Sequence, residues 1–225
     1  MINSEKKYVI AIDGEPGTGK STLAKTIARK LGIVYVDTGA MYRAVGLYFL
    51  QQGIEATDAN MKEHQHKIHI GFQYEGENLK VILNDQDVTD AIRSTEASKM
   101  ASCVSRLLSV REYLVDKQRQ MADEYSIVMD GQDIGTVVFP NANLKIYLTA
   151  NMEERAKRRQ KDLVAKGEEI SVEQVKQDLI QRAKADLTRK NSPIRKAEDA
   201  YELDSTANTP EELAERVIIL LQEKR

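Results

Sequence analysis

The sequence predicts an α/β fold in which a parallel five-stranded sheet is flanked by helices. Short apolar runs recur along the chain and alternate with helical segments, an order typical of a parallel sheet covered by helices. A glycine-rich segment of the phosphate-binding pattern G-x-x-x-x-G-K-[ST] lies between the first apolar run and the first helical pattern. The predicted strands are Tyr8–Ile12, Ile33–Val36, Ile127–Met129, Leu144–Leu148 and Tyr201–Leu203.

The glycine-rich segment is the strongest functional signal in the chain. Its glycines let the backbone turn tightly and point successive N–H groups inward, and the N-terminus of the next helix adds about half a positive charge. Lys20 can reach the terminal phosphates of a nucleoside triphosphate, and the Ser21 hydroxyl can ligate Mg²⁺. The strand before it and the helix after it disfavour a simple turn. The predicted triphosphate-binding residues are Gly14, Glu15, Pro16, Gly17, Thr18, Gly19, Lys20, Ser21 and Thr22.

The hydrophobic period changes from helical to two between residues 67 and 90. Two alternating runs, Ile68–Tyr74 and Leu79–Leu83, are predicted as strands, with turns at residues 75–78 and 84–87. One face of such strands is polar, so they form a small antiparallel insert outside the central sheet.

Helix signals mark the C-terminal third. Residues 151–170 are the most cationic stretch and are predicted to be helical, with Gly167 ending that helix and Ser171 beginning the next. Thr209 is predicted to cap the last helix, which has Pro210 in its first turn.

Composition narrows the class of protein. The chain has 225 residues, of which 41% are hydrophobic and 30% are charged. Its net charge of −2 gives no overall positive potential that would attract nucleic acid or an anionic membrane. No apolar run approaches the roughly 20 residues that span a bilayer, and no leader pattern is present, which predicts a cytoplasmic protein. The single Cys103 excludes an intrachain disulfide and lacks a partner motif for nucleophilic catalysis.

Three histidines, His64, His66 and His69, lie close together in the sequence. Their spacing crosses a helix-to-strand change and brings no cysteine or acidic partner, so we expect solvated surface residues and not a metal site.

Residues 37–43 follow the second predicted strand, and ligands of open α/β sheets bind beyond the carboxyl ends of strands. Thr38 and Arg43 offer a hydroxyl and a guanidinium to an anionic acceptor, and a planar guanidinium bonds two phosphate oxygens at once. Taken alone, the segment is equally compatible with two interpretations of Arg43: a phosphate-binding residue, or a residue on the surface of a helix.

Residues 130–136 follow the third predicted strand. Asp130, at the end of an apolar strand, is a candidate Walker-B carboxylate that holds Mg²⁺ directly or through water, which leaves Asp133 to read the acceptor. Structural capping of a turn by either aspartate is the alternative.

Arg182, Asp186 and Arg189 are spaced to share one face of a predicted helix that Ser192-Pro193 closes. On its own this pattern favours a surface stripe with an ion pair worth about 0.3–0.5 kcal/mol. The alternative is a set of cations that converges on the transferred phosphate.

Together these motifs resemble the bacterial cytidylate kinases, which are P-loop nucleoside monophosphate kinases, over nearly the full chain. The segments at residues 37–43, 130–136 and 182–193 carry the resemblance, because the phosphate loop alone is shared by many unrelated proteins. The resemblance implies a P-loop NTPase-type sheet, a β insert in the acceptor-binding region and a helical lid. It also implies transfer of a phosphoryl group from ATP to CMP or dCMP, with Mg²⁺ as cofactor.

The resemblance also implies roles for individual residues. Thr38, Arg43 and Arg189 would hold the acceptor phosphate, Ser102, Arg111 and Asp133 would read cytosine, and Arg182 with Asp186 would hold the ribose. Arg155, Arg158 and Arg159 resemble the lid. The predicted catalytic residues are Lys20, Arg155, Arg159 and Arg189, and the predicted metal ligands are Ser21 and Asp130.

Two positions depart from the family pattern. Gln132, which we also predict to bind substrate, stands where relatives usually carry arginine, so one charge-assisted contact worth about 1.5–3 kcal/mol is lost. Ala183 stands where relatives often carry aspartate.

The predicted organisation is a single kinase domain with three parts. The core comprises residues 1–40, 93–150 and 190–225, the acceptor-binding region residues 41–92 with the insert at about 67–90, and the lid residues 151–189. The predicted partners are ATP and CMP or dCMP, with no nucleic acid and no membrane, and the predicted oligomeric state is a monomer.

Two alternatives stay open from the sequence. One is another P-loop kinase, for a different nucleotide or for a small molecule. The other is a non-catalytic nucleotide switch, which the lack of a guanine-reading Asn-Lys-x-Asp motif disfavours for GTP.

Overall fold

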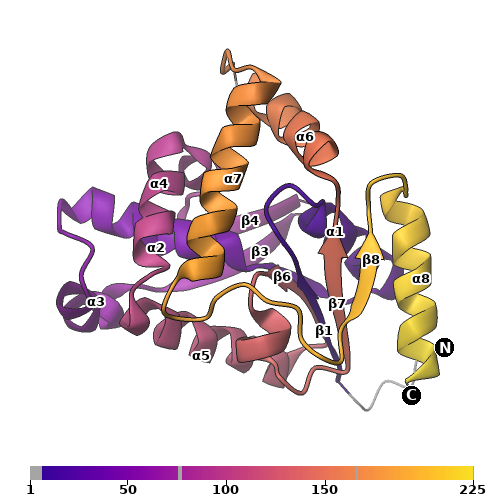
Figure 1. Cartoon of the computed structure of the whole chain (residues 1–225). Helices are drawn as coiled ribbons and strands as arrows, with labels where there is room; N and C mark the ends of the chain where they lie inside the picture. The colour runs from indigo at the N-terminus through magenta and orange to yellow at the C-terminus, as the bar shows by residue number, and fades with distance from the viewer. Residues whose placement is uncertain (1–6, 76–77, 166, 225) are drawn as a thin grey trace. The chain divides into compact units, whose positions relative to one another are not determined.

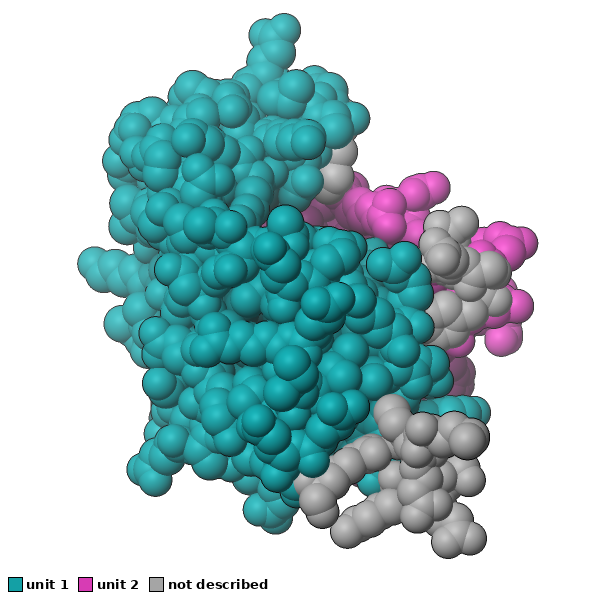
Figure 2. Space-filling view, turned by 90° about the vertical axis from the view of Figure 1, so that its right-hand side faces the viewer, with its two compact units in different colours: residues 1–36, 121–225 teal, residues 37–120 magenta. Residues whose placement is uncertain are grey.

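A computed structural model describes residues 7–75, 78–165 and 167–224 of the chain. The chain divides into two compact units, one formed by residues 1–36 and 121–225 and the other by residues 37–120 (Figure 2).

The first unit is built on a five-stranded sheet with the order β2-β6-β1-β7-β8. Strand β1 lies at its centre and pairs in parallel with β6 on one side and β7 on the other, and β8 extends the sheet in parallel from β7 (Figure 1). The predicted fold class is confirmed. The strands are β1 Val9–Asp13, β2 Val34–Asp37, β6 Ile127–Gly131, β7 Leu144–Thr149 and β8 Tyr201–Asp204.

The centre of the sheet is the core of this unit. In β1, Ile10, Ala11 and Ile12 are all fully buried, as expected for a strand whose two faces are both covered. Helix α1 (Lys20–Leu31) packs against α8 (Pro210–Glu223). The predicted cap of α8 is confirmed, because the Thr209 side chain accepts from Glu212 N while Glu212 accepts from Thr209 N.

Helices α6 (Met152–Val164) and α7 (Val172–Thr188) lie side by side and follow β7 in the chain (Figure 1). They share a small apolar core of Ala156, Leu163, Val175 and Leu179. Gly167 has a φ of 84° between them, and Ser171 caps α7 as predicted. The placement of Arg189 on the helix was wrong: α7 ends at Thr188 and Arg189 has extended backbone.

The second unit consists of helices and a three-stranded antiparallel sheet of order β3-β4-β5, which confirms the predicted insert. Its elements are α2 Thr38–Gln52, α3 Asp58–His64, η1 Gln65–Lys67, β3 Ile70–Glu75, β4 Asn78–Leu83, β5 Gln86–Asp87, η2 Ala91–Arg93, α4 Thr95–Val104 and the first part of α5 Leu108–Glu124.

One predicted turn of the insert was wrong. Residues 84–87 are not all turn, because Gln86–Asp87 form β5. Asn84 and Asp85 have φ values of 48° and 65°, so these two residues alone make the hairpin turn, and both types tolerate positive φ. The other predicted turn contains Gly76 and Glu77, which lie outside the described residues.

Candidate active site

The phosphate-binding segment connects the carboxyl end of β1 to the start of α1. Two glycines are required by close approach: a Cβ on Gly14 would lie 2.2 Å from the Leu148 carbonyl oxygen, and one on Gly17 would lie 3.2 Å from Cβ of Arg155. Their φ values are 150° and 84°, which favour glycine. The segment therefore has the tight path that brings backbone N–H groups and the α1 N-terminus toward an anion.

Lys20 lies at the first position of α1, and its Nζ donates a 2.8 Å hydrogen bond to the Glu15 carbonyl oxygen inside the loop. The side chain is partly exposed, yet desolvation by the surrounding protein lowers its pKa to about 8 from an ordinary 10.5. Asp130 and Asp13 oppose that shift because they favour the charged ammonium. A bound triphosphate would favour the charged form in the same way.

Ser21 and Asp130 lie together, as predicted. Ser21 Oγ donates a 2.8 Å hydrogen bond to Oδ2 of Asp130, and the Tyr35 hydroxyl donates a 2.9 Å bond to Oδ1. A hydroxyl and a carboxylate are oxygen ligands of the type that Mg²⁺ prefers, and this ion is commonly held by one or two protein groups plus substrate phosphates. The two side chains fit a magnesium site. Among the residues that the structure describes, no three His, Cys, Asp or Glu side chains gather to hold a metal.

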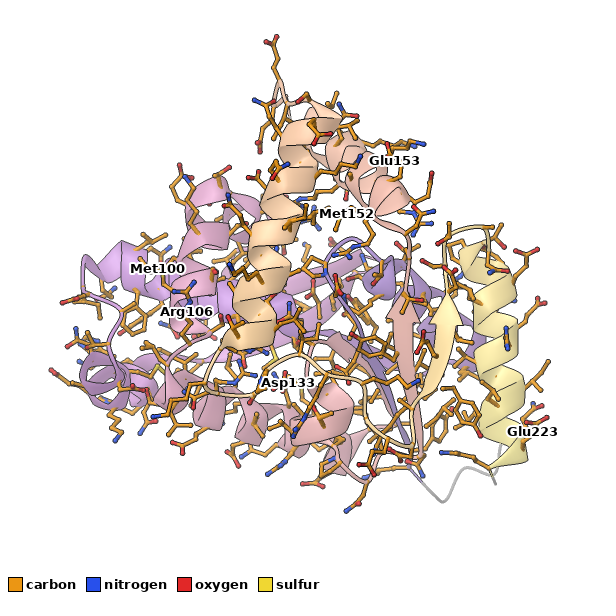
Figure 3. The ribbon with its side chains drawn as sticks, viewed as in Figure 1. Met100, Arg106, Asp133, Met152, Glu153 and Glu223 are labelled. Carbon is orange, nitrogen blue, oxygen red and sulfur yellow. The ribbon has the colours of Figure 1, made fainter. Side chains whose placement is uncertain are left out.

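The predicted acceptor-reading residues of the first unit follow β6. Asp133 is 5% exposed and stands immediately before η3, a π-helix at Ile134–Val138 (Figure 3). Gln132 Nε2 donates a 2.6 Å hydrogen bond to Oδ2 of Asp186 on α7. The loop after β6 is thereby joined to the last turn of α7.

Asp186 is the centre of the predicted ribose and phosphate cluster. Its carboxylate lies 3.9 Å from Arg182 Nε and 3.8 Å from Arg189 Nη1. The Arg182 side chain is 59% exposed, but that of Arg189 is only 8% exposed, and Arg189 Nε donates to the Ser192 carbonyl oxygen at 2.6 Å. The three residues are brought together even though Arg189 lies beyond the helix.

The three predicted lid arginines differ in their partners. Arg155 is 5% exposed, forms an ion pair with Glu15, and donates from Nε to the Pro16 carbonyl oxygen at 2.8 Å. Its Nη2 is buried and has no hydrogen-bond partner among the described residues. Arg155 therefore contacts the phosphate loop and retains a donor for a ligand.

Arg158 donates from Nη1 to the Ser205 hydroxyl at 3.0 Å and from Nη2 to the Ser205 carbonyl oxygen at 2.6 Å. Ser205 Oγ in turn donates to the Thr18 carbonyl oxygen at 2.7 Å. Arg159 is partly exposed and makes no hydrogen bond or ion pair with the rest of the described chain.

The second unit carries Thr38 and Arg43 on α2. Asp37 caps this helix: its Oδ1 accepts from Ala40 N at 2.8 Å, and its Oδ2 pairs with Arg43 Nη2 at 3.1 Å. Thr38 is buried. Arg43 Nε is also buried, and within the described residues it has no hydrogen-bond partner. Asp37 therefore orients a guanidinium that retains an unused donor.

Arg111 on α5 is buried in the same unit. Its guanidinium carbon lies 5.4 Å from the centre of the Tyr42 ring, and Nη1 donates to the Ser105 carbonyl oxygen at 3.0 Å. Ser102, on α4, is exposed. The structure thus stacks Arg111 on the ring of the residue that precedes Arg43.

Several residues of this site were missed from the sequence: Asp13, Tyr35, Asp37 and Ser205. Asp13 ends an apolar strand, which is the signal that identified Asp130, so it could have been found. Asp37 precedes a helix and is a favoured cap type. Tyr35 and Ser205 act through partners far away in the sequence and leave no local signal.

The sequence predicts no metal-binding role for the histidines and no nucleophilic role for Cys103, and the structure gives the surroundings of two of these residues. The His64 ring nitrogen Nδ1 bonds the Tyr48 hydroxyl at 3.0 Å. Cys103 is an exposed residue of α4. In the part of the chain that the structure describes, no helix is long and apolar enough to cross a membrane.

A glycine-rich loop at the carboxyl end of the central strand, with a lysine inside it and a serine–aspartate pair beside it, defines a P-loop nucleotide-binding protein. Shikimate kinase from Acinetobacter baumannii has the same fold, with a TM-score of 0.50 and 15% identity over 98% of this chain and 96% of that one.

The sequence comparisons narrow the class to one family. A family model described as cytidylate kinase matches residues 10–223. The cytidylate kinase of Carboxydothermus hydrogenoformans is 45% identical over 96% of this chain and 97% of its own length. That of Bacillus subtilis is 43% identical over 98% and 99%. The chain belongs to the cytidylate kinase family, enzymes that transfer a phosphoryl group to CMP or dCMP.

Proposed function

We propose that this enzyme transfers the γ-phosphoryl group of ATP to the phosphate of CMP or dCMP, with Lys20, Arg155, Arg159 and Arg189 around the transferred group. The observation that carries the proposal is the 2.8 Å hydrogen bond between Ser21 and Asp130. It joins the loop that would hold the donor to the segment, residues 130–136, that would hold the acceptor.

The reaction needs little covalent work from the protein. The bond between the γ-phosphorus and its bridging oxygen breaks, and an oxygen of the acceptor phosphate bonds to that phosphorus, which gives ADP and CDP or dCDP. A phosphate monoester is largely a dianion near neutral pH because its second pKa is about 6. The nucleophile is therefore already charged, and catalysis rests on in-line placement and on stabilising charge.

The chain's own residues would divide this work. Lys20 and Arg159 would contact the donor phosphates, while Thr38, Arg43 and Arg189 would bind the acceptor phosphate. Mg²⁺ held near Ser21 and Asp130 would neutralise the charge of the phosphates. Arg43 Nε and Arg155 Nη2 are buried donors that lack hydrogen-bond partners among the described residues. These two donors support binding of the acceptor phosphate and of the donor phosphates, respectively.

The acceptor base would be read by Asp133 with Ser102 and Arg111, and the ribose by Arg182 with Asp186. A carboxylate accepts a hydrogen bond from the amino group of cytosine, whereas uracil presents an acceptor there and is repelled. The buried position of Asp133 favours such discrimination, because a polar group unpaired in a buried site costs about 1–3 kcal/mol.

An acceptor panel tests the proposal. CMP, dCMP, UMP, AMP and shikimate are compared in a coupled assay of ADP release, and we expect turnover with CMP and dCMP. Turnover with AMP or shikimate but not CMP would refute it, and tight ATP binding without transfer would favour a nucleotide switch.

A variant tests the role of Asp133. In Asp133→Ala we expect a raised KM for CMP and an unchanged affinity for ATP. An equal loss of affinity for both substrates would overturn the proposed role of Asp133.

We also propose that the enzyme works as a monomer in the cytoplasm. Sedimentation of the purified chain tests the oligomeric state.

A further inference from the structure

The Asp13 carboxylate is buried at the carboxyl end of β1 and bonds a segment far away in the sequence. It is 4% exposed, its Oδ1 accepts from Ile134 N at 2.7 Å, and its Oδ2 accepts from Gly135 N at 2.7 Å. These are the first two N–H groups of η3, so a strand residue caps the π-helix that follows Asp133.

Such a cap normally comes from the residue just before the helix. The first N–H groups of a helix have no acceptor within it, and an aspartate at the preceding position commonly supplies one. Asp133 occupies that position, yet its side chain makes no capping hydrogen bond. Because Asp13 satisfies the two N–H groups, the Asp133 carboxylate is not required for this structural task.

The backbone of Asp133 is fixed by the same helix. Its carbonyl oxygen accepts from Val137 N at 2.9 Å and from Val138 N at 3.2 Å, which is the bifurcated pattern of a π turn. Single π turns are rare and are frequently found at functional sites. An interaction that holds the start of η3 therefore also holds the Asp133 backbone, from which the side chain projects.

Gly135 gives independent evidence for a close fit. A Cβ at this position would lie 3.2 Å from Oδ2 of Asp13 and 3.1 Å from Cδ of Lys145. Lys145 cannot easily withdraw, because its buried ammonium pairs with Asp199 at 2.8 Å. An added methyl group would therefore fit only if the carboxylate or the lysine chain moved by a few tenths of an ångström.

We propose that Asp13 is a positioning residue for acceptor specificity: by capping η3 in place of Asp133, it orients the Asp133 carboxylate toward the base of the acceptor. This inference rests on the proposed role of Asp133. It assigns Asp13 to the acceptor, although Asp13 directly precedes the loop that would bind the donor.

Asp13→Asn is the direct test. The side chain keeps its size, but an amide offers one acceptor and turns an NH₂ group toward the second N–H, so one of the two capping bonds is lost. We expect KM for CMP to rise roughly tenfold and the ratio of kcat/KM for CMP over UMP to fall by a similar factor. We expect KM for ATP to change less than about twofold, because the proposed role of Asp133 is to bind the acceptor base and not ATP.

A lower melting temperature with an unchanged CMP-to-UMP ratio would overturn the inference, because it would make Asp13 a structural cap only. An equal rise in both KM values would also overturn it, because it would assign Asp13 to the phosphate loop. If Asp13→Asn does not fold, Gly135→Ala decides in its place: its added methyl pushes against Oδ2 while the charge stays, and the same shift in the CMP-to-UMP ratio is expected.

Glu212→Gln is the matched control. The Glu212 carboxylate also accepts from a helix-capping residue, Thr209 N at 2.8 Å, but on α8, which carries no predicted site residue. We expect lower stability and unchanged acceptor specificity.

A double variant tests whether Asp13 acts through Asp133. Adding Asp13→Asn to Asp133→Ala should cause no further fall in the CMP-to-UMP ratio, and a further fall of the same size as in the single variant contradicts the inference. Lack of transfer to CMP by the unmodified enzyme refutes the proposed function itself, before any variant is compared.

Discussion

Gln132 and Asp186 are joined by a 2.6 Å hydrogen bond from Nε2 to Oδ2, which connects the loop after β6 to the last turn of α7. Asp186 also faces Arg182 and Arg189 at 3.9 and 3.8 Å. A neutral amide at position 132 therefore shares this carboxylate with two cations.

Gln132→Arg should improve use of CMP. The guanidinium can still donate to Asp186 and adds a positive charge near the proposed acceptor phosphate, so we expect kcat/KM for CMP to rise about tenfold or more. Steady-state kinetics measure the change, and Gln222→Arg, on the exposed side of α8, adds the same charge away from the site. A fall in kcat/KM would instead mean that Gln132 serves to orient Asp186.

Arg159→Gln should lower kcat on the order of 100-fold, the usual loss for one donor that stabilises transition-state charge. Arg159 makes no hydrogen bond or ion pair within the described part of the chain, so its removal should leave thermal stability unchanged. Lys157→Gln is the control on the same helix, because Lys157 is exposed and pairs with Glu154 at 3.2 Å. Equal kcat values for the two variants would remove Arg159 from the catalytic set.

The Glu15–Arg155 pair should couple the phosphate loop to α6. Arg155 is almost fully buried and bonds both Glu15 and the Pro16 carbonyl oxygen. In a double-mutant cycle of Glu15→Gln and Arg155→Met, urea unfolding should give a coupling free energy of about 1–3 kcal/mol. The exposed Lys30–Glu215 pair should give no more than about 1 kcal/mol, and similar values for the two pairs would contradict the prediction.

Asp13 should make stability depend on pH. Burial raises its pKa to about 7 from an ordinary 3.8, against the lowering effect of the two backbone hydrogen bonds. The titratable groups that face it are Asp133, Lys20 and the neutral phenol of Tyr147, with the Lys145 chain across Gly135.

Between pH 4 and 7 the folded state then holds a proton that the unfolded state has released. The free energy of unfolding should therefore fall as pH rises through this window, by up to about 1.4 kcal/mol per pH unit, and become flat above it. The difference between the original chain and Asp13→Asn isolates this contribution in denaturant titrations at several pH values. A difference that does not vary with pH from 4 to 8 would rule out a raised pKa.

Gly14→Ala should destabilise the protein by about 3 kcal/mol or more, because its φ of 150° and a Cβ only 2.2 Å from the Leu148 carbonyl oxygen both oppose a side chain. Gly32→Ala is a matched control: Gly32 also has a positive φ, 65°, but no atom lies within 4 Å of its added Cβ. That variant should lose about 1 kcal/mol. Chemical denaturation compares them, and equal losses would show that the clash at Gly14 is relieved.

The fold could be predicted because its signals are local. Strands β1, β6 and β7 at the centre of the sheet are short, mainly apolar runs, and Thr209 and Ser171 are recognisable caps. The prediction failed at β5, whose two residues, Gln86 and Asp87, are both exposed and carry no apolar period. It also failed for Arg189, since the extended backbone at the end of α7 is not encoded in the spacing of charges.

The candidate site was predictable in its motifs but not in its partners. Lys20, Ser21 and Asp130 belong to sequence patterns, and the structure places Ser21 against Asp130. The contacts between Gln132 and Asp186 and between Arg158 and Ser205 join residues that are far apart in the chain, so only the folded structure identifies them.

The bonds from Asp13 to Ile134 and Gly135 have a consequence for protein engineering. The segment that would recognise the base is not self-contained, because its first helical turn depends on a side chain supplied by another strand. Grafting residues 130–136 alone into another P-loop scaffold would transfer the recognition groups without their support. A graft that keeps an aspartate at the end of the central strand and a glycine opposite it would transfer both.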